Sequence, residues 1–232
     1  MAETLEDRRT ALSMLDVALK EILRDDLELN RAWAAMKATY LQSNYFAHHT
    51  ATIDLGCKIG NDTKIWHNTH VMKSAVIGDR CILGQNTFVA PNVVLGNGTK
   101  VQNNVSLYEG VRCEEDTFIG PSVVFTNVIN PRSAIERKAE FMPTLVKKGA
   151  SIGANSTIVC GHTIGAYAFV GAGSLVTSCI PDNAMVYGHP ARLQYWVSDA
   201  GHRLAFDGDK AVCSATGDKY IKETDLSIKK IS

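Results

Sequence analysis

The sequence has no excess of charge of either sign, because 24 Lys and Arg residues balance 24 Asp and Glu residues in a chain of 232. Without a basic field, binding to nucleic acid or to an acidic membrane is not expected. The six cysteines form no C-x-x-C pair, which argues against a zinc module and a disulfide framework. The opening MAETLEDRRTAL lacks the apolar run of a secretory signal. We therefore expect a cytoplasmic protein with free thiols.

Glycine and proline are both missing from residues 1–44, and the first glycine is Gly56. This leader has the spacing of amphipathic helices, with apolar residues at three- and four-residue steps. They are Leu12, Leu15, Leu19, Ile22, Leu23, Leu29, Trp33, Met36 and Tyr40. We predict an α-helical leader over 1–44, made of one helix or of two that break near Asp25 and Asp26. A packing or oligomer-contact role is expected for it, with partner binding as the alternative.

Residues 149–181 contain no Asp, Glu, Lys or Arg, which at first suggests a membrane span. The stretch is rich in Gly, Ser, Thr and Asn, however, and it follows a period of six. Apolar residues occupy every sixth position from Ile53 to Phe125, and again from Val146 to Val176. A period of six fits neither a helix nor an alternating strand. It fits short strands joined by tight corners, three to a coil of about eighteen residues.

Stacked coils of this kind bury each other's faces, as in solenoid proteins. The aliphatic residue of each repeat fills the interior, and a small residue four positions later lies inside the corner. Gly or Asn at the corners tolerates unusual φ values. The sequence therefore predicts a mainly β protein, a parallel β-helix with about four coils before residue 126 and two after 145.

The tail, residues 198–232, has the look of a zinc ribbon that has lost its ligands. Ser198, Ala200 and Thr216 stand where cysteines would be expected, and Cys213 alone remains. One thiolate cannot hold a structural Zn²⁺, which needs four ligands. We expect a small metal-free β-hairpin packed on the end of the β-helix.

The repeat breaks at residues 126–145, TNVINPRSAIERKAEFMPTL, and the break is polar. A loop this long inside a regular stack is usually functional, because loops carry polar groups without disturbing the coils. We expect this loop to hold the site.

Several motifs stand in one order along the chain: IWHNTHV (65–71), LGQN (83–86), VQNNVSLYEGV (101–111), GPSVVFTNVINPRSAIERKAEF (120–141), TLVKKGASIGANSTIVCG (144–161) and YGHPAR (187–192). Together they resemble the hexapeptide-repeat sugar-nucleotide N-acetyltransferases, most closely the UDP-2-acetamido-3-amino-2,3-dideoxyglucuronate type and its dTDP-3-amino-3,6-dideoxyhexose relatives. The resemblance implies a left-handed β-helix domain over 45–197 and a homotrimer. It also implies transfer of acetyl from acetyl-CoA to a sugar 3-amino group, for surface polysaccharide synthesis. Met142 stands where these enzymes usually have Arg.

The resemblance also implies roles for particular residues. Asn127 would hold the attacking amine, Arg132 would pair with a substrate anion, and Glu140 would accept hydrogen bonds from the sugar. The sugar-nucleotide side would be lined by Gln102, Asn103, Asn104 and Tyr108. The backbone amides of Gly153, Ala154, Gly171 and Ala172 would bind the pantetheine arm of CoA, and its phosphates would meet Lys147, Lys148 and Arg192. No metal is expected.

Other interpretations stay open. His162 is an alternative general base, because imidazole titrates near neutral pH, although it can equally be a histidine satisfied by a backbone carbonyl. Another acyltransferase of this fold would take a serine or a hexose hydroxyl as acceptor. A γ-carbonic-anhydrase-like protein would need His67, His70 and His162 around one Zn²⁺. A non-catalytic β-helix scaffold is the last alternative.

Overall fold

The computed structural model describes residues 5–23, 26–42 and 44–231, and it divides into two compact units, 1–46 and 47–232. The first unit is a pair of helices, α1 (Leu5–Leu23) and α2 (Leu27–Gln42). Asp26 begins α2, where its carboxylate accepts the amide of Leu29 at 2.9 Å. The helices meet through Asp16, which accepts Trp33 Nε1 at 2.6 Å and Lys37 Nζ at 2.8 Å. Two helices are therefore present, while Asp25 and the Tyr40 side chain lie outside the described parts.

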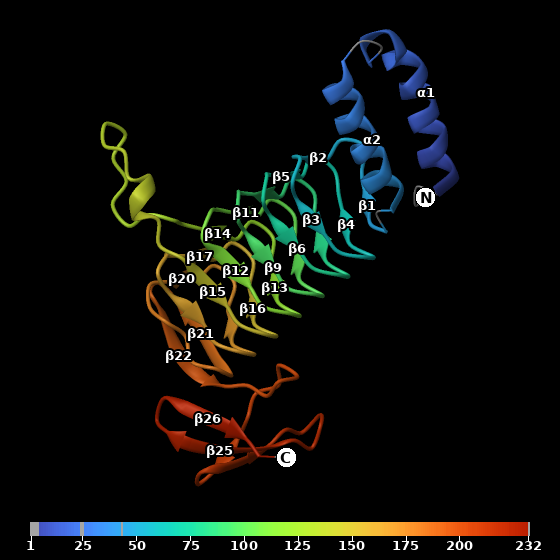
Figure 1. Ribbon diagram of the computed structural model, residues 1–232. Coiled ribbons are helices and arrows are strands. Elements are labelled where there is room, and N and C mark those ends of the chain that lie inside the picture. Colours follow the sequence, from blue (N-terminus) through green and yellow to red (C-terminus); the bar gives the residue numbers. More distant parts are fainter. Residues whose placement is uncertain (1–4, 24–25, 43, 232) are drawn as a thin grey trace. The chain divides into compact units, whose positions relative to one another are not determined.

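The second unit is a left-handed parallel β-helix with three sheets around one core (Figure 1). Sheet A contains β1 (Phe46–Ala47), β4 (Lys64–Ile65), β7 (Ile82–Leu83), β10 (Lys100–Val101), β13 (Phe118–Ile119), β16 (Ser151–Ile152), β19 (Phe169–Val170), β21 (Ala184–Gly188) and the antiparallel β22 (Ala191–Trp196). Sheet B contains β2 (Thr52–Ile53), β5 (His70–Val71), β8 (Phe88–Val89), β11 (Ser106–Leu107), β14 (Val124–Phe125), β17 (Thr157–Ile158) and β20 (Leu175–Val176). Sheet C contains β3 (Lys58–Ile59), β6 (Val76–Ile77), β9 (Val94–Leu95), β12 (Val111–Cys113), β15 (Thr144–Val146) and β18 (Thr163–Ile164).

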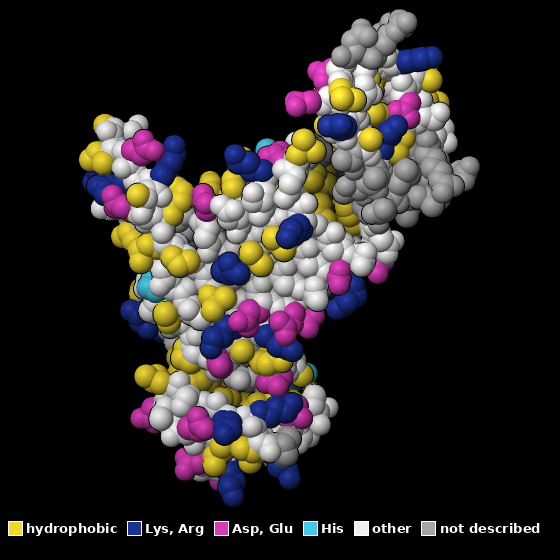
Figure 2. Space-filling view, viewed as in Figure 1, with side chains coloured by type: hydrophobic (Ala, Val, Ile, Leu, Met, Phe, Trp, Pro, Cys, Tyr) yellow, Lys and Arg dark blue, Asp and Glu magenta, His cyan; other side chains and the backbone are white. Residues whose placement is uncertain are grey.

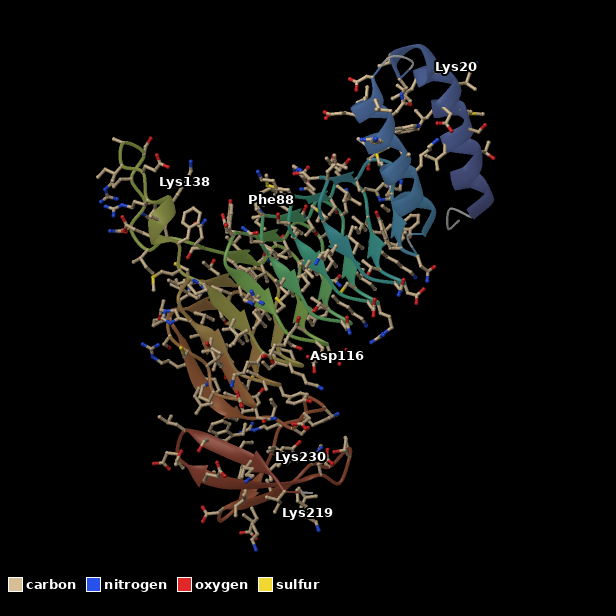
Figure 3. The ribbon with its side chains drawn as sticks, viewed as in Figure 1. Lys20, Phe88, Asp116, Lys138, Lys219 and Lys230 are labelled. Atoms are coloured by element: carbon tan, nitrogen blue, oxygen red, sulfur yellow. The ribbon has the colours of Figure 1, made fainter. Side chains whose placement is uncertain are left out.

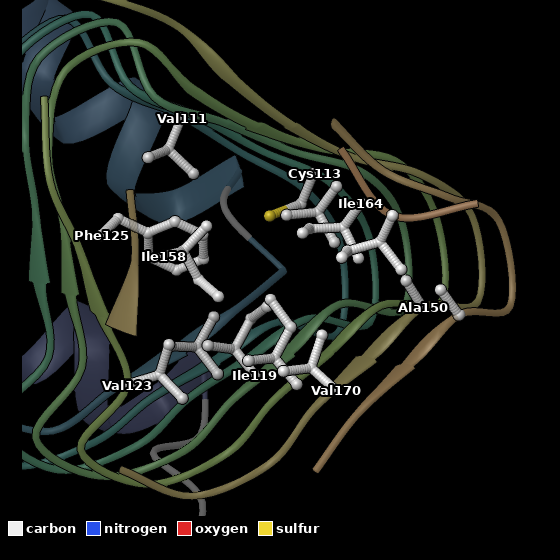
Figure 4. Close-up of a cluster of buried hydrophobic side chains, with 14 of the residues drawn as sticks. Val111, Cys113, Ile119, Val123, Phe125, Ala150, Ile158, Ile164 and Val170 are labelled. Atoms are coloured by element: carbon white, nitrogen blue, oxygen red, sulfur yellow. The ribbon is translucent and has the colours of Figure 1, made fainter. Parts of the chain in front are cut away.

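The six-residue period is explained by this architecture. Every predicted interior position is the last residue of a strand, one for each strand from β2 to β20. All are buried except Ile53 and Ile59, which are half-buried because they belong to the first coil. Figure 4 shows the interior, where Phe125 and Ile158 of sheet B face Cys113 and Ile164 of sheet C. The predicted fold class is confirmed.

The turns between sheets adopt left-handed backbone at every sixth residue, and glycine is not required there. Ser74, Arg80 and Tyr167 have φ values of 64°, 55° and 55°. Each coil helps to hold the next in this conformation, since the Arg80 amide donates to Asn61 O at 2.8 Å and the Tyr167 amide to Lys148 O at 2.8 Å. Hydrogen bonds between coils thus offset the strain of non-glycine residues.

The tail forms a larger sheet than the sequence predicted. Instead of a hairpin, four antiparallel strands are present: β23 (Phe206–Asp207), β24 (Lys210–Val212), β25 (Lys219–Thr224) and β26 (Ser227–Lys230). The hairpin prediction was wrong because the alternation of apolar and polar residues in 219–230 is weak by itself. These strands are stabilised by their neighbours, since β25 pairs with both β24 and β26. Cys213 is buried and its thiol donates to Ser198 Oγ at 3.2 Å.

Candidate functional site

The long loop, residues 126–143 with the short helix η1 (Lys138–Glu140), replaces one of the turns that lead from sheet B to sheet C. We call this line of turns the BC edge, and the AB and CA edges are defined in the same way. The loop projects from the β-helix (Figure 1) and carries both signs of charge (Figure 2). Its two ends are tied to the next coil: Thr126 Oγ1 accepts the amide of Cys160 at 3.0 Å, and Pro143 O accepts that of Gly161 at 3.0 Å.

Asn127 and His162 are brought to the base of this loop. The Asn127 carbonyl accepts the amide of Met142 at 2.9 Å, and the Met142 side chain lies over Gly161, the residue before His162. A Cβ on Gly161 would be 2.6 Å from Met142 Cε, so glycine makes this approach feasible. His162 is half-buried, whereas Ala150, at the same corner position two repeats earlier, is buried. Asn127 and Gly161, the residue before His162, therefore both contact Met142 at the loop base, although Asn127 and His162 lie 35 residues apart in the sequence.

Arg132 and Glu140 both lie in the exposed part of the loop. Arg132 Nη1 donates to Pro131 O at 3.0 Å, so its guanidinium is bound locally. Glu140 is held by Arg137 Nη1 at 2.8 Å, one turn away. Arg137 has no role predicted from the sequence, although its i, i+3 spacing from Glu140 is the signal that could have identified it. Its Nε is buried and has no hydrogen-bond partner within the described residues.

The predicted polar row is split between two edges. Gln102, Asn103 and Asn104 lie on the AB edge, where Asn103 Oδ1 accepts the amide of Gln85 at 2.9 Å. Asn104 has φ 60° and its Oδ1 accepts Asn86 Nδ2 at 3.1 Å. These two asparagines therefore stabilise the turns themselves. Tyr108 follows β11 on the BC edge, the edge that carries the loop.

The predicted pantetheine-binding segments also lie on the AB edge, stacked one coil above the other. A Cβ on Gly153 would lie 2.5 Å from the Ala172 amide nitrogen, which explains the glycine. The amides of Gly153 and Gly171 donate to Val170 O at 2.8 Å and Val186 O at 2.7 Å. This corrects the prediction for the two glycine amides, because the coils already use them. For the amides of Ala154 and Ala172 the pantetheine-binding role stays a prediction.

The basic side chains predicted to meet the CoA phosphates do not lie on the AB edge. Lys147 and Lys148 are on the CA edge, where they form ion pairs with Asp182 at 3.1 Å and Glu115 at 3.0 Å. The Glu115 carboxylate raises the pKa of Lys148 above its ordinary value, so this lysine stays charged. Arg192 is exposed on β22. The predicted groups therefore occupy all three edges of the β-helix.

The histidines required by a γ-carbonic-anhydrase site are not brought together within one chain. His67 stacks on His48 at 3.5 Å between ring centroids, His70 is on β5, and His162 is at the loop base. Among the described residues, no three His, Cys, Asp or Glu side chains are grouped so as to hold a metal ion. Within the same residues, no helix is long and apolar enough to cross a membrane.

Comparison with known proteins identifies the class first. The model of the family "Bacterial transferase hexapeptide (six repeats)" matches residues 56–91. That of "Hexapeptide repeat of succinyl-transferase" matches residues 75–109 and 144–178. Both matches identify these segments as the hexapeptide repeats of bacterial transferases.

One relative defines the family more closely. Over 175 residues, 75% of this chain and 90% of the relative, the sequence is 45% identical to dTDP-3-amino-3,6-dideoxy-alpha-D-galactopyranose 3-N-acetyltransferase of Aneurinibacillus thermoaerophilus. The chain belongs to this family of sugar-nucleotide 3-N-acetyltransferases, and the resemblance seen in the motifs is confirmed.

Other known proteins are less similar to this chain. Bifunctional protein GlmU of Heliobacterium modesticaldum is 27% identical over 80% of this chain, which spans only 49% of that protein's length. Among solved structures, PerB of Caulobacter crescentus, in complex with CoA and GDP-perosamine, is 19% identical, with a TM-score of 0.42 over 73% of this chain and 66% of that one. The acetyltransferase domain of PglB of Neisseria gonorrhoeae has 20% identity and a TM-score of 0.43 over 72% of this chain and 66% of that one.

Proposed function

We propose that this enzyme transfers the acetyl group of acetyl-CoA to the 3-amino group of a nucleotide-linked amino sugar. The observation that carries the proposal is the 45% identity to a 3-N-acetyltransferase over 90% of that enzyme's length. The loop supports it, because Met142 at its base contacts both Asn127 and Gly161, the residue before His162.

The reaction needs an unprotonated amine, a thioester and a stabilised oxyanion. The amine nitrogen bonds to the acetyl carbonyl carbon, the C–S bond breaks, the thiolate of CoA leaves, and one amine proton is released. Asn127 can orient the amine by hydrogen bonds, but its amide cannot accept the proton. His162 can accept it, and a backbone N–H can stabilise the oxyanion. Holding amine and thioester together supplies a large part of the acceleration.

We further propose that the enzyme is a homotrimer in which neighbouring chains complete each site. The support is the division of the predicted groups: the loop with Asn127 is on the BC edge, Ala154 and Ala172 are on the AB edge, and Lys147 is on the CA edge. One chain does not present these groups on one surface. Two chains that pack edge to edge can place a CoA-binding edge of one against the loop of the other.

Residues 45–197 would be the acetyltransferase domain, with 126–145 as its functional loop, 1–44 as a leader and 198–232 as a degenerate ribbon. Sugar nucleotides and acetyl-CoA are made in the cytoplasm, so we place the enzyme there, in the synthesis of a surface polysaccharide such as lipopolysaccharide or O-antigen.

The decisive experiment incubates the purified full chain with acetyl-CoA and a panel of dTDP-, UDP- and GDP-linked 3-amino sugars, and follows the release of free thiol. Serine and an unmodified hexose are included as acceptors. Acetylation of a 3-amino sugar is expected. Thiol release only with serine or hexose, or none at all, would refute the proposal.

The roles at the loop base are tested in the same assay. We expect Asn127→Ala to lower kcat by about 100-fold or more through lost positioning, and His162→Ala to have a smaller effect. Ile129→Ala, an exposed change in the same loop, is the matched control. A larger loss in His162→Ala would make this histidine the general base and Asn127 secondary.

A further inference from the structure

A row of aromatic side chains runs along sheet B and onto its BC edge, one from each of three neighbouring coils: His70 on β5, Phe88 on β8 and Tyr108 directly after β11. The rings of His70 and Phe88 meet edge to face with centroids 6.2 Å apart, and those of Phe88 and Tyr108 lie 5.9 Å apart and tilted. Tyr108 is 40% exposed, and Phe88 and His70 are partly exposed. The row is therefore an open ring surface on an otherwise aliphatic and polar face.

One end of the row is held in a defined orientation by charged groups. His70 Nε2 lies 2.9 Å from Asp54 Oδ1, and Asp54 Oδ2 accepts the amide of Lys73 at 3.2 Å. The hydrogen bond with His70 lowers the pKa of Asp54, so this carboxylate is ionised at neutral pH. Lys73 itself is exposed, which leaves a cation beside the ring surface.

The row leads directly to the proposed acetylation site. Strands β5, β8, β11 and β14 are consecutive neighbours in sheet B, and β14 runs into Thr126 and Asn127 at the loop base. Neighbouring strands are about 4.8 Å apart, so Phe88 lies roughly 10 Å and His70 roughly 14 Å from β14, the strand that precedes Asn127. Figure 3 shows Phe88 and the loop residue Lys138 on the same border of the β-helix. This separation suits a sugar joined to its nucleobase through a ribose and two phosphates.

We propose that the row of His70, Phe88 and Tyr108 binds the nucleobase of the sugar nucleotide; this rests on the proposed function. The ligand class is a nucleoside diphosphate. Aromatic faces stack on any base. The sugar then points along sheet B towards Asn127, so the substrate runs parallel to the axis of the β-helix.

Another exposed aromatic residue provides the matched control. Phe118 on β13 is 38% exposed, like Tyr108, but it lies on sheet A and makes no ring contact within the described residues. Substituting Phe118 removes a similar area of ring from a different face. A general effect of losing an exposed ring would therefore weaken dTDP binding in the Phe118 and Tyr108 variants alike. Loss of a nucleobase site would weaken it only in the Tyr108 variant.

The test measures dTDP binding by calorimetry without acetyl-CoA, for wild type, Tyr108→Ala, Tyr108→Phe, Phe88→Leu and Phe118→Ala. Phe88→Leu keeps an apolar side chain on the core, and circular dichroism checks that each variant is folded. Removing one stacking ring is expected to weaken dTDP binding by about tenfold or more in Tyr108→Ala and Phe88→Leu. Tyr108→Phe and Phe118→Ala should bind dTDP within about twofold of wild type.

Kinetics with the sugar nucleotide add a second readout. In Tyr108→Ala and Phe88→Leu its KM should rise in parallel with the dTDP dissociation constant, while the KM for acetyl-CoA stays unchanged. Equal losses in Phe118→Ala, unchanged binding in Tyr108→Ala, or a wild type that binds none of dTDP, UDP and GDP would overturn the proposal. Failure of the proposed function is distinct: dTDP would bind through the row, yet no 3-amino sugar would be acetylated.

Discussion

Replacing Leu107 with alanine should destabilise the β-helix far more than the same change at Leu55. Leu107 is fully buried at the end of β11, between β8 and β14, whereas Leu55 is 81% exposed in a turn. Leu→Ala in a core costs about 2–5 kcal/mol, depending on how far the surroundings collapse into the cavity. Here collapse is limited, because hydrogen bonds such as that from the Ala90 amide to Leu107 O at 2.9 Å set the spacing of the coils. We therefore expect about 3–5 kcal/mol for Leu107→Ala.

The assay is thermal and urea denaturation at one fixed protein concentration, because association would shift the midpoint. A loss of this size lowers Tm by roughly 6–20 °C for a chain of this length. Leu55→Ala should change stability by less than about 0.5 kcal/mol. Similar midpoints for the two variants, or a loss below about 1 kcal/mol in Leu107→Ala, would refute the assignment of the six-residue period to the interior.

Three further predictions concern other parts of the chain. Asn104→Gly should leave Tm nearly unchanged, while Asn104→Val should cost about 1–2 kcal/mol in urea denaturation, because φ is 60° there. Lys230 lowers the pKa of Asp218, so their contact stabilises the folded chain at pH values above the ordinary Asp pKa. This stabilisation is lost as the pH falls below that value. The drop in Tm from pH 7 to about pH 2.5, below the ordinary Asp pKa, should therefore be smaller in Lys230→Ala, and an equal drop would contradict this. Iodoacetamide should modify exposed Cys179 quickly and leave Cys113, whose pKa burial raises to about 12, unmodified until unfolding, as measured by mass spectrometry.

The architecture could be predicted from the sequence because every coil needs the same pattern of side chains. An apolar residue every sixth position must face inward in every coil, and one misplaced residue would leave a cavity or a buried polar group. The nineteen positions from Ile53 to Val176 are accordingly the last residues of β2 to β20. The two helices of the leader were also predictable, since their apolar spacing is local.

The residues at the turns show where local reasoning stops. Gly and Asn were expected at corners, but Arg80 and Tyr167 also adopt positive φ, because amide hydrogen bonds from the neighbouring coil compensate for the strain. Similarly, the availability of the Gly153 amide could not be read from the sequence, because its acceptor, Val170 O, is on another coil.

The sequence by itself determined the period, the interior residues, the position of the loop and the family to which the chain belongs. Only the tertiary structure decided which edge each polar group occupies, because that depends on where in the coil a residue falls and on which groups the coils already use. It therefore placed both Asn127 and the residue before His162 against Met142, separated Tyr108 from Asn103, and aligned His70, Phe88 and Tyr108, which lie eighteen and twenty residues apart in the sequence but on neighbouring coils.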